Sequence, residues 1–310
     1  MRIPLLTIIK SKVSNTNLSM EIFYRLYKIS RQGYSQALAR LQKEEKMMLE
    51  IGKAVNSYRL KHDRRAGSRS LFYNLDIKNA YNIGITSFEQ MMSRYGLSLA
   101  PLRMRVVTTK SSSQSWNYEN LCNGMIVNGI NQLVVGDITY LKLGKVRYFL
   151  FSLIDVFSLR IVGYHLSRRM RKEEAIQALE MLVKLRGREN LSRCIHHTDG
   201  GGQYFAKKYL NKLGEISSSV AKTCLENGLA EQKNGYIKNH LIPTVRLNNP
   251  DTLVREMDRI MHFYNHERKQ KELGWKSPVE FEKSLRSEQK NLYVRLHDFE
   301  KKIPSKTQRF

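Results

Sequence analysis

The spacing of apolar side chains divides the chain into two parts that differ in secondary structure. Between residues 21 and 105, apolar residues recur every three to four positions with basic residues between them, as at Met48, Ile51, Val55 and Tyr58. This is the period of an amphipathic α-helix. The first part is therefore predicted to be a set of small helices with a positive outer face.

Two strings within this first part carry helix start and stop signals. Ser30, in ISRQGYSQALARL, is predicted to cap a helix, and the helix in SFEQMMSRYGL is predicted to begin at Ser87 and to end at Gly96. Both strings fit helix-turn-helix units. An ordinary helical domain with a solvated basic face fits the same pattern, and the residues alone leave both interpretations open.

The second part of the chain alternates strands with helices. Three runs rich in β-branched and aromatic residues, LVVGDITYL, KVRYFLFSLIDVF and LRIVGYHL, are separated by short breaks and predict three consecutive antiparallel strands. Six further elements are predicted after these strands. In order, they are a helix ending at Gly187, a strand around Ile195, a helix ending near Gly214, a weak strand at 217–222, and helices at 229–242 and 252–268.

A Ser/Thr-rich stretch without a sustained apolar period, VVTTKSSSQSWNYEN, separates the two parts and is predicted to be a linker. The expected organisation follows from this boundary. It consists of an N-terminal extension at 1–20, a helical, helix-turn-helix-like domain at 21–105, a linker at 106–128, an α/β core at 129–285 and a basic C-terminal tail at 286–310.

The composition is strongly basic, with 53 lysines and arginines against 28 aspartates and glutamates in 310 residues, a formal charge of +25. Such an excess predicts a polyanionic partner such as double-stranded DNA, although a passive nucleic-acid binder would show it equally well. No membrane partner is expected, because the apolar stretch at 3–9 is too short to span a bilayer and lacks the features of a secretion signal. A cytoplasmic location is predicted.

Three acidic residues stand in distinctive strings of the second part: Asp137 in GDITY, Asp199 in HHTDGGGQY and Glu231 in ENGLAEQKNGYIK. Asp137 lies in the middle of the first predicted strand, and Asp199 directly follows a strand, where ligands commonly bind. Glu231 lies near the start of a helix that Asn227 is predicted to cap. An unpaired carboxylate within a sheet is costly, so these residues need a cation or hydrogen-bond donors.

Three carboxylates that converge on one point repel one another unless a divalent cation neutralises them. Hard oxygen ligands with open positions suit Mg²⁺ or Mn²⁺ far better than zinc. Two such ions about 4 Å apart activate an attacking hydroxyl and stabilise the leaving oxygen in an in-line displacement at a phosphodiester. The residues therefore predict an enzyme that acts on DNA with two Mg²⁺ or Mn²⁺ ions as cofactors.

Taken in order, these strings resemble the OrfB-type transposases of the insertion sequence three family. NQLVVGDITYL is similar to the family's first-aspartate strand, LIDVFSLRIVGYHL to its next two strands, HHTDGGGQY to its second-aspartate turn and ENGLAEQKNGYIK to its glutamate helix. The string YNHERKQKELGWKSPVEF is similar to the family's C-terminal signature. The resemblance covers roughly residues 22–281, and several ordered motifs are more specific than any one of them.

The resemblance implies the fold class α/β: a ribonuclease-H-like core, as in retroviral integrases, with a mixed five-stranded sheet flanked by helices, preceded by an all-α helix-turn-helix-like domain. It implies a DDE transposase in which Asp137, Asp199 and Glu231 are the catalytic residues and metal ligands. Such an enzyme binds insertion-sequence ends, cleaves DNA strands and transfers the 3′-hydroxyl to a target strand. By the same resemblance, the part at 21–105 is the DNA-binding domain and the part at 129–285 is the integrase-like catalytic core. A catalytically silent DNA-binding descendant, or a ribonuclease-H-like nuclease without joining activity, are the alternatives.

The same resemblance bears on partners and location. The expected partners are the element ends and the target DNA, further copies of this chain in a homo-oligomer on DNA, and a protein encoded in an upstream reading frame. The expected location is the bacterial cytoplasm, in association with the nucleoid. No heptad repeat in the sequence specifies an oligomer.

Six further residues are candidate DNA contacts near the three carboxylates. Lys238 lies two helical turns after Glu231, and strand alternation places His197 on the side of Asp199. A solvated lysine and a packed histidine are the structural alternatives for these two. The other candidates lie in loops or in a basic run between a strand and a helix: Gln203, Arg168, Arg169 and Arg171.

Other polar residues in the core are expected to be structural. Asp155 ends a strand before a tight turn and is expected to accept local hydrogen bonds rather than to bind a metal ion. Near the end of the last predicted helix, Tyr264, Asn265 and Arg268 are expected to pack rather than to contact DNA.

Overall fold

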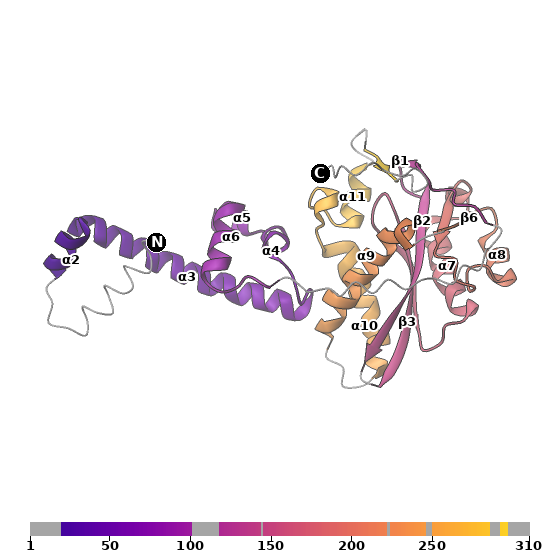
Figure 1. The fold of residues 1–310 in the computed structure, drawn as a ribbon, viewed down its shortest axis with the longest axis horizontal. Helices are drawn as coiled ribbons and strands as arrows, with labels where there is room; N and C mark the ends of the chain where they lie inside the picture. Colours follow the sequence, from indigo (N-terminus) through magenta and orange to yellow (C-terminus); the bar gives the residue numbers. More distant parts are fainter. Residues whose placement is uncertain are drawn as a thin grey trace.

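A computed structural model describes residues 20–100, 118–143, 145–221, 224–245, 250–285 and 292–296 of the chain. The predicted N-terminal extension and most of the predicted linker and C-terminal tail lie outside these residues. Figure 1 shows a helical part that extends from an α/β body. In the described ranges, no helix is both long and apolar enough to cross a membrane.

The helical part differs from the prediction in the length of one helix. Its elements are α2 (Met20–Tyr27), α3 (Arg31–Lys61), α4 (Ser68–Asn74), α5 (Ile77–Tyr81) and α6 (Ile85–Arg94). The prediction of small helices alone was wrong for α3, which runs for 31 residues because it contains no proline to interrupt its hydrogen bonds.

The predicted helix signals of this part were correct at one helix start and wrong at the other. The Ser30 hydroxyl accepts a 3.0 Å hydrogen bond from the Gly33 amide and caps α3, as predicted. The helix expected to begin at Ser87 begins two residues earlier, after Gly84 in the N-cap position. Its predicted end is confirmed, because Gly96 follows α6 with a φ of 67°.

Five strands of the body form one mixed sheet in the order β4-β3-β2-β5-β6. The strands β2, β3 and β4 are consecutive and antiparallel, and β5 and β6 run parallel to β2. This topology, with helices on both faces, is that of a ribonuclease-H-like fold, so the predicted fold class is confirmed. The strands have the bounds β2 (Leu133–Leu143), β3 (Val146–Asp155), β4 (Ile161–Ser167), β5 (Ile195–Thr198) and β6 (Ser217–Val220).

Both faces of this sheet are covered by helices (Figure 1). On one face, α7 (Lys172–Arg186) and α8 (Lys207–Leu213) pack over Val134 of β2. The other face carries Leu133 and Val135 and is covered by α9 (Gly228–Tyr236), α10 (Pro250–His262) and α11 (Pro278–Leu285). Because side chains alternate along a strand, Asp137 lies on the same face as Leu133 and Val135 and points toward α9.

Both α9 and α10 continue into a single π-helical turn, at Ile237–Leu241 and Phe263–Glu267. Such turns are rare and often occur at functional sites. The guanidinium carbon of Arg268 lies 3.7 Å from the centre of the Tyr236 ring at the end of α9. The packing role expected for Arg268 is confirmed.

Asn265, in the second π-helical turn, binds the strand β4. Its side-chain carbonyl accepts a 3.0 Å hydrogen bond from the Ile161 amide, and its side-chain amide donates at 2.9 Å to the Ile161 carbonyl. Tyr264, beside it, is fully buried. The string that begins at Tyr264, YNHERKQKELGWKSPVEF, therefore supports β4 and α9 structurally.

The helical part and the body share one hydrophobic core, which contains residues of α3, α4 and α6 together with residues of the sheet and of α10. Tyr73 of α4 stacks on Trp275 of the body with ring centres 3.9 Å apart. A short pair of strands, β1 (Ile126–Val127) and β7 (Val294–Arg295), joins the start of the body to residues near the end of the chain. This pairing was not predicted.

Candidate active site

Asp137 lies in the middle of β2 and is held by a side chain of α9. Its carboxylate Oδ2 accepts a 2.8 Å hydrogen bond from Nδ2 of Asn234, whose own Oδ1 accepts a 2.8 Å bond from the Ser152 hydroxyl on β3. Asn234 is 1% exposed and Ser152 is fully buried. The Asp137 carboxylate is therefore fixed in direction by a buried chain of hydrogen bonds.

Asp199 follows the last residue of β5 directly and is exposed. β5 is parallel to β2 and pairs Gly136 with Thr198, so Asp199 leaves the sheet next to Asp137. The Asp199 Oδ1 accepts a 3.1 Å hydrogen bond from the Gly201 amide, which shapes the turn. This placement agrees with the expectation that ligands bind where parallel strands end.

Glu231 lies in the first turn of α9, with an exposed side chain. The start of α9 is attached to the sheet, because Nδ2 of Asn227 donates a 3.1 Å hydrogen bond to the Gly136 carbonyl beside Asp137. Asn227 occupies the predicted N-cap position, but the prediction that its side chain caps the helix was wrong. Its amide binds the sheet instead, and this bond places the start of the Glu231 helix over β2.

The three carboxylates influence one another electrostatically. Burial raises the pKa of Asp137; the hydrogen bond from Asn234 opposes this rise, and the charge of Asp199 adds to it. Burial also raises the pKa of Glu231, to which the charges of Asp137 and Asp199 contribute. Mutual repulsion of this kind is relieved when a cation binds between the carboxylates.

The donor set consists of hard carboxylate oxygens, which suit Mg²⁺ or Mn²⁺ by their chemistry. Within the described ranges, however, no three His, Cys, Asp or Glu side chains lie close enough together to hold a metal ion. To bind an ion jointly, the carboxylates of Asp137, Asp199 and Glu231 must therefore move closer together.

The loop after Asp199 contacts the basic segment between β4 and α7. Nε2 of Gln203 donates a 3.4 Å hydrogen bond to the Met170 carbonyl. Arg169 and Arg171, on either side of Met170, are exposed. Gln203 thus anchors the Asp199 loop and holds this basic segment beside it, although the sequence suggested a DNA contact for Gln203.

Two further predicted contacts lie near aromatic rings. The Lys238 ammonium is 5.9 Å from the centre of the Tyr140 ring on β2, and Lys238 is exposed. The Arg168 guanidinium carbon is 5.6 Å from the centre of the Tyr148 ring on β3. Tyr148 belongs to the core on the α9 side of the sheet, whereas Tyr140 pairs with Phe149 on the opposite face.

His197 is 1% exposed, and its Nδ1 lies 2.9 Å from the Ser219 hydroxyl on β6. Burial lowers its pKa, which favours the neutral imidazole. This position favours the structural alternative over the predicted DNA contact. Its neighbour His196 is equally buried and binds the Tyr209 hydroxyl at 2.9 Å on the opposite face.

Asp155 is confirmed as a structural acceptor. Its Oδ1 accepts hydrogen bonds from the Phe157 amide at 3.0 Å and the Ser158 amide at 2.9 Å, and its Oδ2 accepts one from the Asn131 amide at 2.7 Å.

The structure also adds Asn234 and Ser152 to the candidate site. Asn234 follows Glu231 by three residues, a spacing that places both on neighbouring parts of a helix surface, and this was the available sequence signal.

Comparison with known proteins finds relatives of this chain. Residues 128–230 match the sequence family described as Integrase core domain. The chain is 29% identical over 270 residues to the insertion element IS600 uncharacterized 31 kDa protein of Shigella sonnei, covering 83% of this chain and 96% of that protein. It is 31% identical over 136 residues to a putative transposase for insertion sequence element IS986/IS6110 of Mycobacterium tuberculosis, covering 41% of this chain and 49% of that one.

Among solved structures, the catalytic core domain of HTLV-2 integrase, determined in complex with magnesium in a trimeric form, aligns with a TM-score of 0.41 and 22% identity. The alignment covers 53% of this chain and 99% of that one. An intasome of simian T-cell lymphotropic virus in complex with the PP2A regulatory subunit B56 gamma aligns with a TM-score of 0.40 and 17% identity, covering 70% of each chain.

Proposed function

We propose that the chain belongs with the insertion-sequence transposases that carry an integrase core domain, and that it is a DNA strand transferase. It binds the ends of an insertion sequence, cleaves a strand at each end and joins the 3′-hydroxyl to a target strand. The reaction depends on Mg²⁺ or Mn²⁺, and two ions take part.

One observation carries this proposal. Three carboxylates from the middle of β2, from the turn after β5 and from α9 repel one another electrostatically, and two of them have raised pKa values. Maintaining such a group costs stability unless a ligand compensates for it. Asp137, Asp199 and Glu231 are the residues that would hold the ions.

When bound, the ions would supply activation of the attacking hydroxyl and stabilisation of the leaving oxygen. The chain itself contributes orientation and charge. Asn234 directs the Asp137 carboxylate, and the turn at Gly201 directs the Asp199 carboxylate. No side chain needs to act as a covalent nucleophile, because the attacking group is a hydroxyl of water or of DNA.

The DNA backbone lies along the exposed cations next to this site. Arg169 and Arg171 flank the segment that Gln203 attaches to the Asp199 loop, and Lys238 lies on the other side, over β2. Cations so placed position phosphates without reading sequence. The helical part contributes binding to the element ends. Joining of two ends calls for a homo-oligomer, and a partner from an upstream reading frame stays a prediction.

The test uses duplex DNA that carries the genomic flanks of the gene. Wild-type protein and Asp199→Asn are incubated with the labelled duplex, with and without Mg²⁺ or Mn²⁺, and cleaved and joined products are resolved. We expect metal-dependent cleavage and joining by the wild type alone. Cleavage without joining would favour the nuclease alternative, and tight binding without products the silent DNA-binding descendant.

A further inference from the structure

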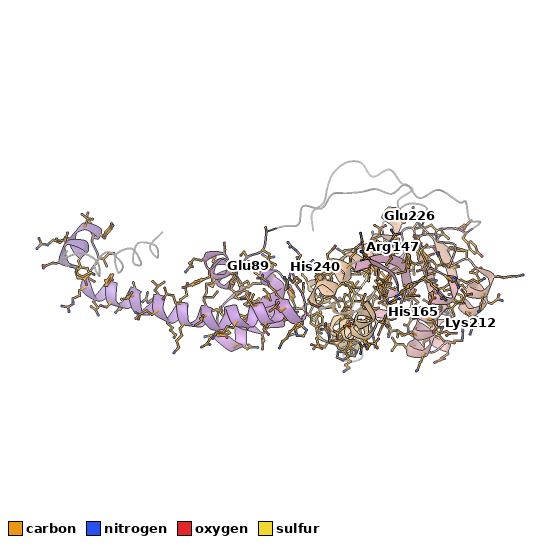
Figure 2. The ribbon with its side chains drawn as sticks, turned by 90° about the horizontal axis from the view of Figure 1, so that it is seen from below. Glu89, Arg147, His165, Lys212, Glu226 and His240 are labelled. Carbon is orange, nitrogen blue, oxygen red and sulfur yellow. The ribbon has the colours of Figure 1, made fainter. Side chains whose placement is uncertain are left out.

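A buried carboxylate of the helical part binds the helix that carries Glu231. Asp63 lies in the turn after α3 and is 2% exposed. Its Oδ2 accepts a hydrogen bond from the hydroxyl of Tyr236, and its Oδ1 lies 2.9 Å from Nδ1 of His240. We call these three residues the interdomain clasp. Figure 2 shows His240 where the helical part meets the body.

Further hydrogen bonds and a ring contact support the residues of the interdomain clasp. The Asp63 Oδ1 also accepts a 3.0 Å hydrogen bond from the Arg65 amide, and the Arg64 amide donates at 3.0 Å to the His240 carbonyl. The rings of Tyr236 and His240 stack with centres 4.4 Å apart. A buried carboxylate with this many partners fixes the direction of each of them.

The clasp favours an ionised Asp63. Burial alone would raise the pKa of Asp63, but the hydrogen bonds from His240 and Tyr236 outweigh burial and lower it. The charge thus persists at neutral pH in a nearly inaccessible place. Charge-assisted hydrogen bonds of this kind are stronger than those between neutral groups.

The position of the clasp along the helix bears on the candidate active site. Tyr236 is the last residue of α9, five residues after Glu231, and His240 lies in the π-helical turn that follows. The start of α9 is tied to the sheet by Asn227, and Asn234, two residues before Tyr236, binds Asp137 of β2. Glu231 therefore lies on a short helix whose two ends are fixed by different parts of the chain.

The Glu231 side chain depends on its helix for its position. It is exposed, and the charges of Asp137 and Asp199 act on its carboxylate. The three carboxylates must also draw together before they can hold an ion, since none of the described acidic groups is yet arranged to do so. A small shift of α9 would directly change the distance from the Glu231 carboxylate to the carboxylates of Asp137 and Asp199.

We propose that Asp63 is a positioning residue of the active site. It lies in the helical part of the chain and sets the rotation of the helix that carries Glu231 and the position of that helix along its axis. The inference rests on the proposed function, because it takes Glu231 to be a metal ligand. It makes the helical part a component of the metal site as well as a DNA-binding unit. Removing the clasp weakens metal binding while the fold persists.

The test measures Mn²⁺ binding by the full chain, from the electron paramagnetic resonance signal of free Mn²⁺. The variants are Asp63→Asn, which removes the charge at nearly constant volume, and Tyr236→Phe, which removes only the hydroxyl. Loss of groups that orient metal ligands typically costs 10- to 100-fold in metal affinity or activity. We expect the Kd for Mn²⁺ to rise roughly tenfold in each variant, with DNA cleavage restored at saturating Mn²⁺.

The matched control is Asp76→Asn. Asp76 lies in the same helical part, and its carboxylate accepts a 2.9 Å hydrogen bond there from the Asn79 side chain. Its substitution should leave the Kd unchanged. Circular dichroism establishes that each variant is folded, and if Asp63→Asn does not fold, Tyr236→Phe decides the matter by itself.

Two negative results have different meanings. Folded Asp63→Asn and Tyr236→Phe variants that bind Mn²⁺ within twofold of the wild type would overturn the positioning role and leave the proposed function intact. If the wild type does not bind Mn²⁺, or if Asp137→Asn binds it equally well, the metal site itself is wrong and the inference fails with it.

Discussion

Asn234 donates a 2.8 Å hydrogen bond from its side-chain amide to the carboxylate of Asp137, across 97 residues of sequence. The bond joins the helix of Glu231 to the strand of Asp137, so it links two of the three carboxylates through one buried side chain. Its other end is fixed by the Ser152 hydroxyl. This chain of hydrogen bonds is the part of the site that is already organised.

Replacement of Asn234 by alanine should therefore damage both the site and the fold. It leaves Asp137 and Ser152 without their shared partner in a buried place, which costs about 1–3 kcal/mol of unfolding free energy. Metal affinity or strand cleavage should fall about 10- to 100-fold. Urea unfolding and Mn²⁺ titration measure the two effects, and Asn239→Ala, on the exposed side of the same helical segment, should change neither.

Metal-free protein should gain stability at neutral pH when Asp137 is replaced by asparagine. A carboxyl whose pKa is raised in the folded state binds its proton more tightly there. Its folded form therefore loses stability as the pH rises from the unfolded pKa near 4 through the folded one. Burial, and the charge of Asp199, raise the pKa of Asp137.

The measurement is thermal unfolding of Asp137→Asn and wild type at pH 7.5 and pH 3.5 in the presence of a chelator. We expect the variant Tm to be higher by a few degrees at pH 7.5, since about 1 kcal/mol moves the Tm of a domain of this size by roughly 2–4 °C. The difference should vanish at pH 3.5, and added Mn²⁺ should stabilise the wild type alone. A more stable wild type at pH 7.5 without metal contradicts the prediction.

Removal of the two exposed arginines beside the Asp199 loop should weaken DNA binding in a manner that depends on salt. Each phosphate contact that is lost reduces the slope of log K against log salt by about 1. Arg169→Ala together with Arg171→Ala should thus reduce the slope by about 2, with similar effects on all DNA sequences. Arg193→Ala is the control, because exposed Arg193 precedes β5 at the opposite end of the strand.

Gly163→Ala should destabilise the body strongly. A Cβ atom at this position of β4 would lie 2.2 Å from the Ala178 carbonyl oxygen of α7, so the helix would have to move away from the sheet. Overpacking of this kind typically costs about 1–3 kcal/mol, and a backbone obstacle places it at the upper end. The control is Gly202→Ala, where a Cβ meets nothing within 4 Å; equal urea midpoints for the two variants would contradict the close approach.

Glu282→Gln should break a largely buried ion pair between α11 and the rest of the body. Glu282, with a side chain 9% exposed, lies 2.6 Å from Arg160 and also pairs with Arg186. Burial alone would raise the pKa of Glu282, but the hydrogen bond and charge of Arg186, together with Arg160, outweigh burial and lower it. Loss of one partner from such a pair costs about 3–5 kcal/mol at neutral pH.

The pH dependence of this effect has a definite sign. A lowered carboxyl pKa adds stability above the unfolded pKa, near 4.3, and this contribution is lost as the pH falls through the folded value. The difference between wild type and Glu282→Gln in urea should therefore shrink below about pH 4. Glu180→Gln, which breaks the half-exposed pair with Lys212, should cost less than about 1 kcal/mol at any pH.

The sequence determined the elements of the core and the residue types of the candidate site. Runs of β-branched residues with a period of two specify strands locally, so β2, β3 and β4 could be assigned before the structure was known. The ordered strings around Asp137, Asp199 and Glu231 indicated the family for the same local reason. Ser30 was recognised as a cap because capping involves only neighbouring residues.

Only the tertiary structure decided which side chains meet across long separations. Asn227 has the sequence pattern of a helix cap. Because α9 packs on the sheet, its side-chain amide instead donates to the Gly136 carbonyl, 91 residues away. His197 follows the expected alternation, yet β6 and its Ser219 cover it. Asp63 finds Tyr236 across 173 residues. Such contacts depend on how whole elements pack, which local propensity does not encode.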